Sequence, residues 1–296
     1  MLVTLVMILA PIALSIAVGY LWVRMGRAFD SGCFGAIAAD IAMPCLIFSS
    51  LAHVDISAIT FARTAIASLV ALLTFAILGA LVLHAAGMRL RTYLPSVTWG
   101  NAGFLGIPLS LYAFGSTGLV YAVTFSAVSL IFNSIFSQAV SLGRADMSAL
   151  LRVPLIYAAI GGAVVASFQI KVPAWLLQSI SLIGGMAVPL VLMMVGASLA
   201  RIKPVVITRA AVFSIGRVMA GAAIAVSVAW IFGITGIARN VLVLQCAMPV
   251  AALAYVFAQK WNNDPEEVAS LVAVSTWISV VSVPVMLGLM SGELSL

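Results

Sequence analysis

The residues of this sequence that could do chemistry are few, and most lie inside long apolar runs. The stretch W-G-N-A-G-F-L-G-I-P-L-S, residues 99–110, places Asn101, Gly103 and Pro108 in the middle of such a run. A second run carries Gln245 and Pro249 in the same order. Amide side chains can donate hydrogen bonds to a carboxylate without adding a buried charge. Each amide could equally cap a helix broken beside it, and the sequence leaves both roles open.

Two ionisable residues also lie well inside apolar runs, where a charge is costly and is a functional candidate by default. Arg217 could bind a carboxylate through both of its terminal nitrogens, or could pair with Asp40 or cap carbonyl groups of a broken helix. Asp40 precedes Pro44 by one turn. It could accept a proton or bind a cation, or be an interfacial or arginine-paired carboxylate. Asn133 could line a cavity or form hydrogen bonds between helices.

The sequence contains no pattern typical of a catalytic centre. His53 and His84 have no cysteine or carboxylate partner at metal-ligand spacing, and no nucleophile–base signature or phosphate-binding loop is present. We therefore expect no catalytic residue, no metal site and no cofactor, and we leave coupling to H⁺ or Na⁺ open. The net charge of +6 comes from basic residues at the ends of apolar runs, so no nucleic-acid partner is expected.

Composition indicates that these residues are positioned by membrane-spanning helices. Of 296 residues, 64% are apolar and 7% are charged, whereas soluble domains are roughly 45–50% apolar and about 25% charged. A spanning helix needs about 20 mostly apolar residues, and ten such segments fit the chain. We therefore expect an all-α integral membrane protein with the bilayer as a partner. The expected spans are 3–23, 31–51, 61–86, 92–115, 117–141, 150–170, 174–200, 205–232, 238–259 and 266–290.

The distribution of Lys and Arg predicts how the chain is oriented. The odd-numbered loops carry ten of these residues, the even-numbered loops carry three, and Arg217 lies inside a span. Since cytoplasmic loops are enriched in Lys and Arg, the odd loops should face the cytoplasm. Both termini should then be extracytoplasmic, in the inner or plasma membrane of the cell.

Ten spans divide into two halves, residues 1–146 and 147–296, with five spans each. An odd number of spans in each half means that the second half enters the membrane from the opposite side, which predicts inverted repeats. Matched prolines support this division, at offsets of 143, 145 and 141 residues. These pairs are Pro11 with Pro154, Pro44 with Pro189, and Pro108 with Pro249. We expect Pro44 and Pro189 to mark helix interruptions in the second and seventh spans.

The fourth span should be broken between Asn101 and Pro108. Gly100, Gly103, Gly106 and Pro108 together disfavour a continuous helix in this region by about 6 kcal/mol relative to alanine. Broken backbone at membrane depth is tolerated only where it is buried in protein or lines a wet cavity. Two such breaks meeting midway would present half-helix N-termini, which attract anions. The alternative is that the glycines mark close helix packing and the prolines mark kinks.

The stretch G-N-A-G-F-L-G-I-P-L resembles the fourth-helix motif N-x-x-x-x-G-I-P-L of the auxin efflux carrier family. Arg217 and the segments V-L-V-L-Q-C-A-M-P, A-Y-V-F-A-Q-K-W and S-T-W-I-S-V-V-S-V-P are similar to the C-terminal half of the same family. The resemblance implies ten helices in two inverted five-helix repeats. It also implies that helices four and nine cross at their breaks, in a fold shared with bile-acid and sodium/proton carriers. Homodimers are consistent with it.

The resemblance further implies an elevator-like carrier of small organic anions, such as auxin or malonate- and malate-like acids. In such a carrier an inner core moves against a scaffold of spans one, two, six and seven. Residues 142–151 replace the long central loop of the plant members, so the chain is closer to the short prokaryotic type. Leu253–Ala254 and Val250 stand where the plant ninth helix has a second proline and a glutamine. Auxin itself is therefore a less favoured substrate.

The expected function is thus a secondary active transporter of a mono- or dicarboxylate that works by alternating access. A sodium-coupled, bile-acid-like symporter and an anion channel are the alternatives. An intramembrane enzyme would need a catalytic nucleophile or a set of metal ligands within its membrane-spanning segments, and the sequence shows neither.

Overall fold

The computed structural model describes residues 2–52, 58–142, 154–201 and 207–291, and every regular element within those ranges is a helix. Two of the elements, η1 and η2, are single π-helical turns in which the backbone is wider than in an α-helix. In chain order the elements are α1 Leu2–Arg24, α2 Ser31–Ile37, η1 Ala38–Ala42, α3 Met43–Leu51, α4 Ala58–Ala85, α5 Leu90–Thr98, η2 Ala102–Gly106, α6 Ile107–Leu142, α7 Pro154–Ser167, α8 Ala174–Gly184, α9 Ala187–Arg201, α10 Ile207–Ile231, α11 Gly236–Cys246, α12 Ala252–Lys260 and α13 Pro265–Ser291.

Six helical stretches in the described ranges are long and apolar enough to cross a membrane. They are Gly32–Leu51, Phe61–Ala85, Ala102–Val140, Ala174–Ala197, Ile207–Ile231 and Pro265–Met290. This agrees with an integral membrane protein. The third stretch contains the expected junction between the fourth and fifth spans, because Gly115 (φ 66°, ψ −158°) breaks α6 there. Ten spans and inverted repeats stay predictions.

The interrupted spans place their irregular turns on the N-terminal side of a proline. A proline clashes with the carbonyl group four residues before it and cannot donate a hydrogen bond to it, so the turn that precedes the proline is the one that changes. The turns η1 and η2 end two residues before Pro44 and Pro108. A gap at 185–186 precedes Pro189, and the break at 247–251 contains Pro249.

For this reason the break in the fourth span lies earlier than the sequence predicts. Trp99, Gly100 and Asn101 are the non-helical residues. The segment expected to be broken, 101–108, is mostly helical, with Pro108 as the second residue of α6.

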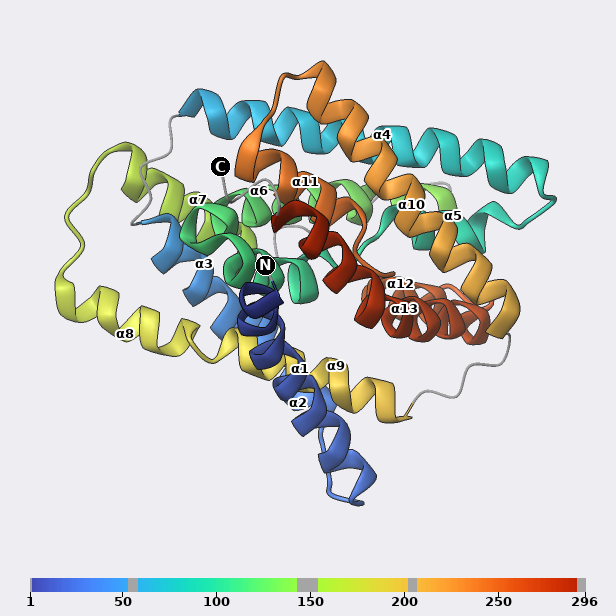
Figure 1. The fold of residues 1–296 in the computed structure, drawn as a ribbon, viewed down its shortest axis with the longest axis horizontal. Helices are drawn as coiled ribbons and strands as arrows, with labels where there is room; N and C mark the ends of the chain where they lie inside the picture. Colours follow the sequence, from blue (N-terminus) through green and yellow to red (C-terminus); the bar gives the residue numbers. More distant parts are fainter. Residues whose placement is uncertain (1, 53–57, 143–153, 202–206, 292–296) are drawn as a thin grey trace.

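The helices fall into two packed groups. One group contains α1, α2, η1, α3, α7, α8 and α9, whereas α4, α5, η2, α6 and α10 to α13 pack with one another. In Figure 1, α3, α7 and α8 gather at the left and α4, α5, α10 and α13 at the top and right. Contacts between the groups are fewer than contacts within them and involve mainly η2, α6 and α13. The first group comprises the elements of expected spans one, two, six and seven.

Within the first group, α1 and α9 pack closely because glycines face the opposite backbone. A Cβ atom at Gly19 would lie 1.9 Å from the carbonyl oxygen of Met193, and one at Gly196 would lie 1.9 Å from that of Ile16. Small residues that let helix backbones approach are the usual basis of helix association in membranes, where the lipid is as apolar as the side chains.

Replacing Gly196 by alanine should therefore force α1 and α9 apart and destabilise the protein by about 1–3 kcal/mol, as overpacking does. Thermal unfolding in detergent would measure the loss as a lower Tm. Gly216→Ala is the matched control, because the added Cβ would meet no atom within 4 Å. Equal Tm values for the two variants would contradict the close-packing argument.

A polar cluster joins the α4–α5 and α12–α13 connections at one end of the second group. Arg89 forms an ion pair with Asp264 at 3.2 Å, and Thr92 donates a hydrogen bond to the same carboxylate at 2.8 Å. Nearby, Arg209 pairs with Glu267 at 2.7 Å. The cluster brings together residues adjoining three odd-numbered loops, which is the pattern that the charge rule requires of one membrane face.

The hydrogen bond from Thr92, followed by the interactions with Arg89, lowers the pKa of Asp264. A carboxyl group whose pKa is lower in the folded state stabilises the fold above its unfolded-state pKa, and the stabilisation is lost as the pH falls through the folded-state value. We expect Asp264→Asn to flatten the fall of Tm in that acidic range while changing Tm little at the lowest pH. An unchanged acid profile would show that the carboxylate contributes nothing; the effect should be modest because the site is exposed.

Candidate functional site

The two central helix interruptions are joined by backbone hydrogen bonds. The N–H of Asn101 donates to the carbonyl of Pro249 at 2.7 Å, and the N–H of Ala251 donates to the carbonyl of Trp99 at 2.9 Å. Gly100 and Val250 thereby form an isolated antiparallel bridge. The bridge satisfies backbone groups that would each cost several kcal/mol if left unpaired in a bilayer.

Arg217 of α10 lies against this bridge and is 5% exposed. Its Nε donates to the carbonyls of Ser96 and Val97, at 3.3 and 3.0 Å, and its Nη1 donates to the carbonyl of Met248. The first two carbonyls belong to the last turn of α5, and the third lies just beyond α11. The guanidinium therefore caps two helix C-termini, where the helix dipole favours a cation.

These hydrogen bonds distinguish between the two structural roles considered for Arg217, which are pairing with Asp40 and capping helix carbonyls. It caps carbonyls of broken helices and does not pair with Asp40, since the two ion pairs in the described part of the chain involve neither residue. The ring of Phe75 lies 5.6 Å from the guanidinium carbon, at a cation–π distance. Gly100 is needed beside it, because a Cβ there would lie 2.7 Å from a guanidinium nitrogen.

A cavity of about 340 Å³ adjoins the bridge at Trp99–Asn101 and Ala251, and Arg217 is not among its lining residues. It is bounded by η1, both interruptions, the middle of α6 and the start of α7. The lining includes three of the sequence candidates, Asp40, Asn101 and Gly103. A Cβ at Gly103 would meet no atom within 4 Å, so this position faces open space.

Two helix N-termini reach this cavity. In the first turn that follows Asn101, the backbone hydrogen bonds begin at Leu105 and Gly106, which both donate to the Asn101 carbonyl. The preceding N–H groups, at residues 102–104, belong to residues that line the cavity. Ala251 and Leu253, at the start of α12, line it as well. Helix N-termini carry free N–H donors and a partial positive charge, so the cavity has the features of an anion site.

The remaining wall of the cavity is mainly apolar. Trp99 and Phe257 stack with their ring centroids 5.0 Å apart, and Met43, Leu130 and Leu155 complete this surface. Asp40 is the one ionisable side chain among the described lining residues. Asn101 makes no side-chain hydrogen bond that caps η2, so its amide is not committed to capping the helix that follows it.

The other sequence candidates do not line the cavity. Gln245 packs against η2, where a Cβ at Gly106 would lie 2.1 Å from its Oε1, and its Nε2 donates to Ser110 at 3.4 Å. Asn133 donates to the carbonyl and hydroxyl of Ser129, at 2.9 and 3.1 Å. Pro108, Pro249, Pro44 and Pro189 act through the backbone, next to the irregular turns described above.

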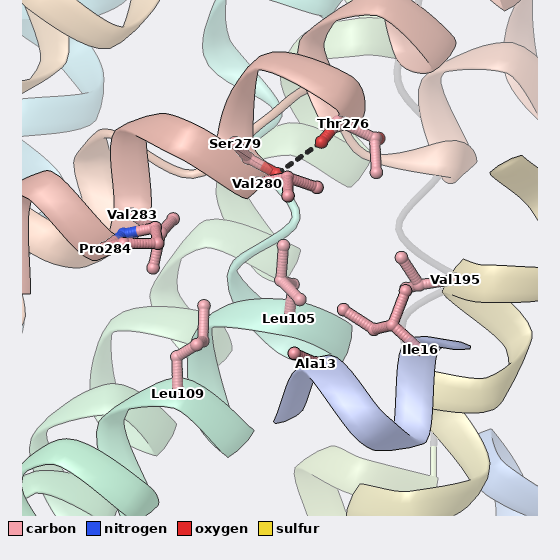
Figure 2. Close-up of a pocket in the computed structure, with 10 residues that line it drawn as sticks. All are labelled: Ala13, Ile16, Leu105, Leu109, Val195, Thr276, Ser279, Val280, Val283 and Pro284. Carbon is pink, nitrogen blue, oxygen red and sulfur yellow. Dashed lines mark hydrogen bonds between the residues drawn. The ribbon is translucent and has the colours of Figure 1, made fainter. Parts of the chain in front are cut away.

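A second and smaller cavity, of about 90 Å³, separates the two groups of helices. Figure 2 shows Leu105 and Leu109 facing Ile16 and Val195 across it, with α13 side chains closing the top. The hydroxyls of Thr276 and Ser279 donate to carbonyls of their own helix, both at 2.7 Å. This cavity is consequently apolar and has no free polar group suited to an anion.

The family model described as "Membrane transport protein" matches residues 4–138 and 137–287. The chain belongs to this family, that of the auxin efflux carriers. It is 27% identical over 270 residues to an uncharacterized transporter of Methanothermobacter thermautotrophicus, covering 86% of this chain and 87% of that one. It is also 25% identical over 191 residues to an uncharacterized transporter of Methanocaldococcus jannaschii, covering 61% and 62% of the two chains. The chain is thus a membrane transporter.

Several residues of the candidate site escaped the sequence reasoning. Ser126, Ser129 and Ser134 line the cavity from α6, and Trp99 and Phe257 form its aromatic wall. The serines recur at helical spacing along with Asn133, and this periodicity was the available signal. Nothing in the sequence marked the aromatic pair, because Trp99 lies in the first interruption and Phe257 lies in α12, 158 residues later.

The spacing of Ser275, Ser279 and Ser282 in the sequence indicates helix packing, but Ser275 of α13 has a further role. Its hydroxyl accepts a hydrogen bond from the N–H of Val250 at 3.0 Å and donates to the carbonyl of Val272 at 3.1 Å. It therefore supports the second interruption, a role that serine spacing alone did not distinguish from packing.

Arg217→Met should destabilise the transporter by about 3 kcal/mol, because hydrogen bonds to charged groups contribute roughly 1.5–3 kcal/mol each. Arg217→Lys should be intermediate, since one ammonium group cannot reproduce the three bonds. Thermal unfolding in detergent, with Arg91→Met as a surface control, would measure the losses. A normal Tm in Arg217→Met would rule out the capping role.

Proposed function

We propose that the protein is a secondary active transporter of a small organic anion, bound in the 340 Å³ cavity beside the bridge. The observation that carries the proposal is the separation of charge around the two interruptions. Arg217 occupies the C-terminal helix ends, while the N-terminal ends at residues 102–104 and 251–253 adjoin the cavity. An anion in the cavity would complete this arrangement, each helix end contributing about 0.3–1 kcal/mol or more when partly buried.

The lining favours an anion with one carboxylate and an apolar body. The carboxylate would accept hydrogen bonds from the N–H groups at 102–104 and from the amide of Asn101. The body would then lie against Trp99, Phe257 and Leu130. A second carboxylate would face either this apolar wall or the carboxylate of Asp40, and both are unfavourable.

Alternating access by movement of the two helix groups is part of the proposal. The groups contact each other sparsely, and the small apolar cavity in Figure 2 lies along their boundary. Two inverted repeats would account for the matching interruptions. The irregular turn at 38–42 corresponds in order to the gap at 185–186, and the break at 99–101 corresponds to that at 247–251.

Asn101→Ala is expected to abolish saturable uptake, because it removes the one neutral amide that lines the cavity beside the N–H groups. The assay would use proteoliposomes and radiolabelled malonate, malate, lactate, a longer aliphatic monocarboxylate and an aryl monocarboxylate. Uptake under imposed pH, Na⁺ and voltage gradients would identify coupling, and currents far above carrier turnover would indicate a channel.

Gly103→Leu tests the same site by filling it. The side chain would project into the open space beside Gly103, so uptake should fall with little change in Tm. Gly216→Leu, at an exposed position with nothing within 4 Å of the added Cβ, is the matched control and should transport normally. Normal uptake by Gly103→Leu would remove this cavity as the substrate site.

A further inference from the structure

The second half of α6 carries a buried polar face that continues beyond the cavity. Its members are Ser126, Ser129, Asn133, Ser134, Ser137 and Gln138, and each is less than 9% exposed. Their spacing of three and four residues places them on one side of the helix. With about 100° per residue, Ser129 and Gln138 mark the edges of an arc about 180° wide, and the other four residues fall inside it. Ser126, Ser129 and Ser134 line the cavity, and the arc continues from them along α6 toward Gln138.

Three oxygens on this face have no hydrogen-bond partner among the described residues. They are Oγ of Ser126, Oδ1 of Asn133 and Oγ of Ser137. A buried polar group left unpaired costs about 1–3 kcal/mol. Serine in a membrane helix can avoid this cost by donating to the carbonyl four residues earlier, as the hydroxyl of Thr124 does to Val120 at 2.9 Å. The three oxygens on this face make no such bond, although each has less than 1 Å² of accessible surface.

The spacing of the three oxygens identifies the kind of ligand. Along the helix axis, positions 126 and 133 are about 10 Å apart, and positions 133 and 137 about 6 Å apart. A single Na⁺ or K⁺ ion cannot contact oxygens spread over such a length, since ion–oxygen distances are about 2–3 Å. Consecutive water molecules, each bonded to polar side chains and to one another, fit this spacing.

We propose that this face of α6 holds a file of water that leads from the cavity toward the Leu142 end of α6. The file covers about 18 Å from Ser126 to Gln138, a large part of the roughly 30 Å hydrocarbon thickness. It would connect Asp40, the ionisable group among the described residues of the cavity, to water at one membrane surface. The file requires only the polar face of α6 and does not depend on which substrate is carried.

Thiol labelling tests this proposal independently of transport. Cys33 and Cys45 are replaced by alanine, and the buried Cys246 is kept as a thiol expected not to react. Ser126→Cys, Asn133→Cys and Ser137→Cys are then treated with a charged, membrane-impermeant thiosulfonate, in vesicles of each orientation. Ala139→Cys, exposed on the opposite face of α6, is the control. A normal Tm confirms that each variant is folded. If Asn133→Cys does not fold, the result for Ser137→Cys, the more conservative change, decides the test.

All three cysteines should react from one side of the membrane, at least about tenfold faster than Ala139→Cys, because thiolate forms in water and not in lipid. Reaction at position 126 alone would mean that only the cavity is hydrated and would overturn the file. Reaction at none of the three would overturn it as well. If all three cysteines are labelled but the protein transports no organic anion, this inference stands and the proposed substrate class is refuted.

Discussion

The pairing of two interrupted helices is the constraint on which the rest of the structure depends. Two backbone hydrogen bonds, from Asn101 to Pro249 and from Ala251 to Trp99, hold the breaks together. Without them, two stretches of non-helical backbone would be unpaired where no water is available. Gly100 leaves room for Arg217 beside the bridge, because an added Cβ would lie 2.7 Å from a guanidinium nitrogen. The hydroxyl of Ser275 accepts a hydrogen bond from the N–H of Val250 in the bridge. The bridge therefore converts an unfavourable local sequence into a stable centre.

The bridge also separates opposite helix ends. Carbonyl groups at the ends of α5 and α11 are bound by the guanidinium of Arg217, whereas the N-termini of η2 and α12 adjoin the cavity. The N–H donors at the two helix N-termini favour negative charge in the cavity, and Asp40 is the ionisable side chain among its described lining residues. The serines of α6 add polar groups to one wall, and Trp99 and Phe257 add an apolar one. The cavity thus combines two helix N-termini, polar side chains and an apolar wall.

The sequence predicted the membrane location, the approximate helix positions and the broken fourth and ninth spans, because these follow from apolar run length and from proline and glycine chemistry. It misplaced the first break by several residues. Pro108 itself sits in a helix, and the strain that it causes is relieved in the preceding turns. Three of the residues that the sequence singled out line the cavity: Asn101, Gly103 and Asp40. Three others do not line it: Gln245, Asn133 and Arg217.

The sequence by itself determined that this chain is a membrane protein with interrupted helices, since composition and backbone propensity are local properties. It also determined the family, through motifs written in consecutive residues. Only the tertiary structure decided which polar groups face one another. Arg217 could have bound a ligand, Asp40 or carbonyls; its partners, Ser96, Val97 and Met248, come from elements brought together only when the two breaks pair. The same pairing created the cavity, because no single helix contains both of its N-terminal ends.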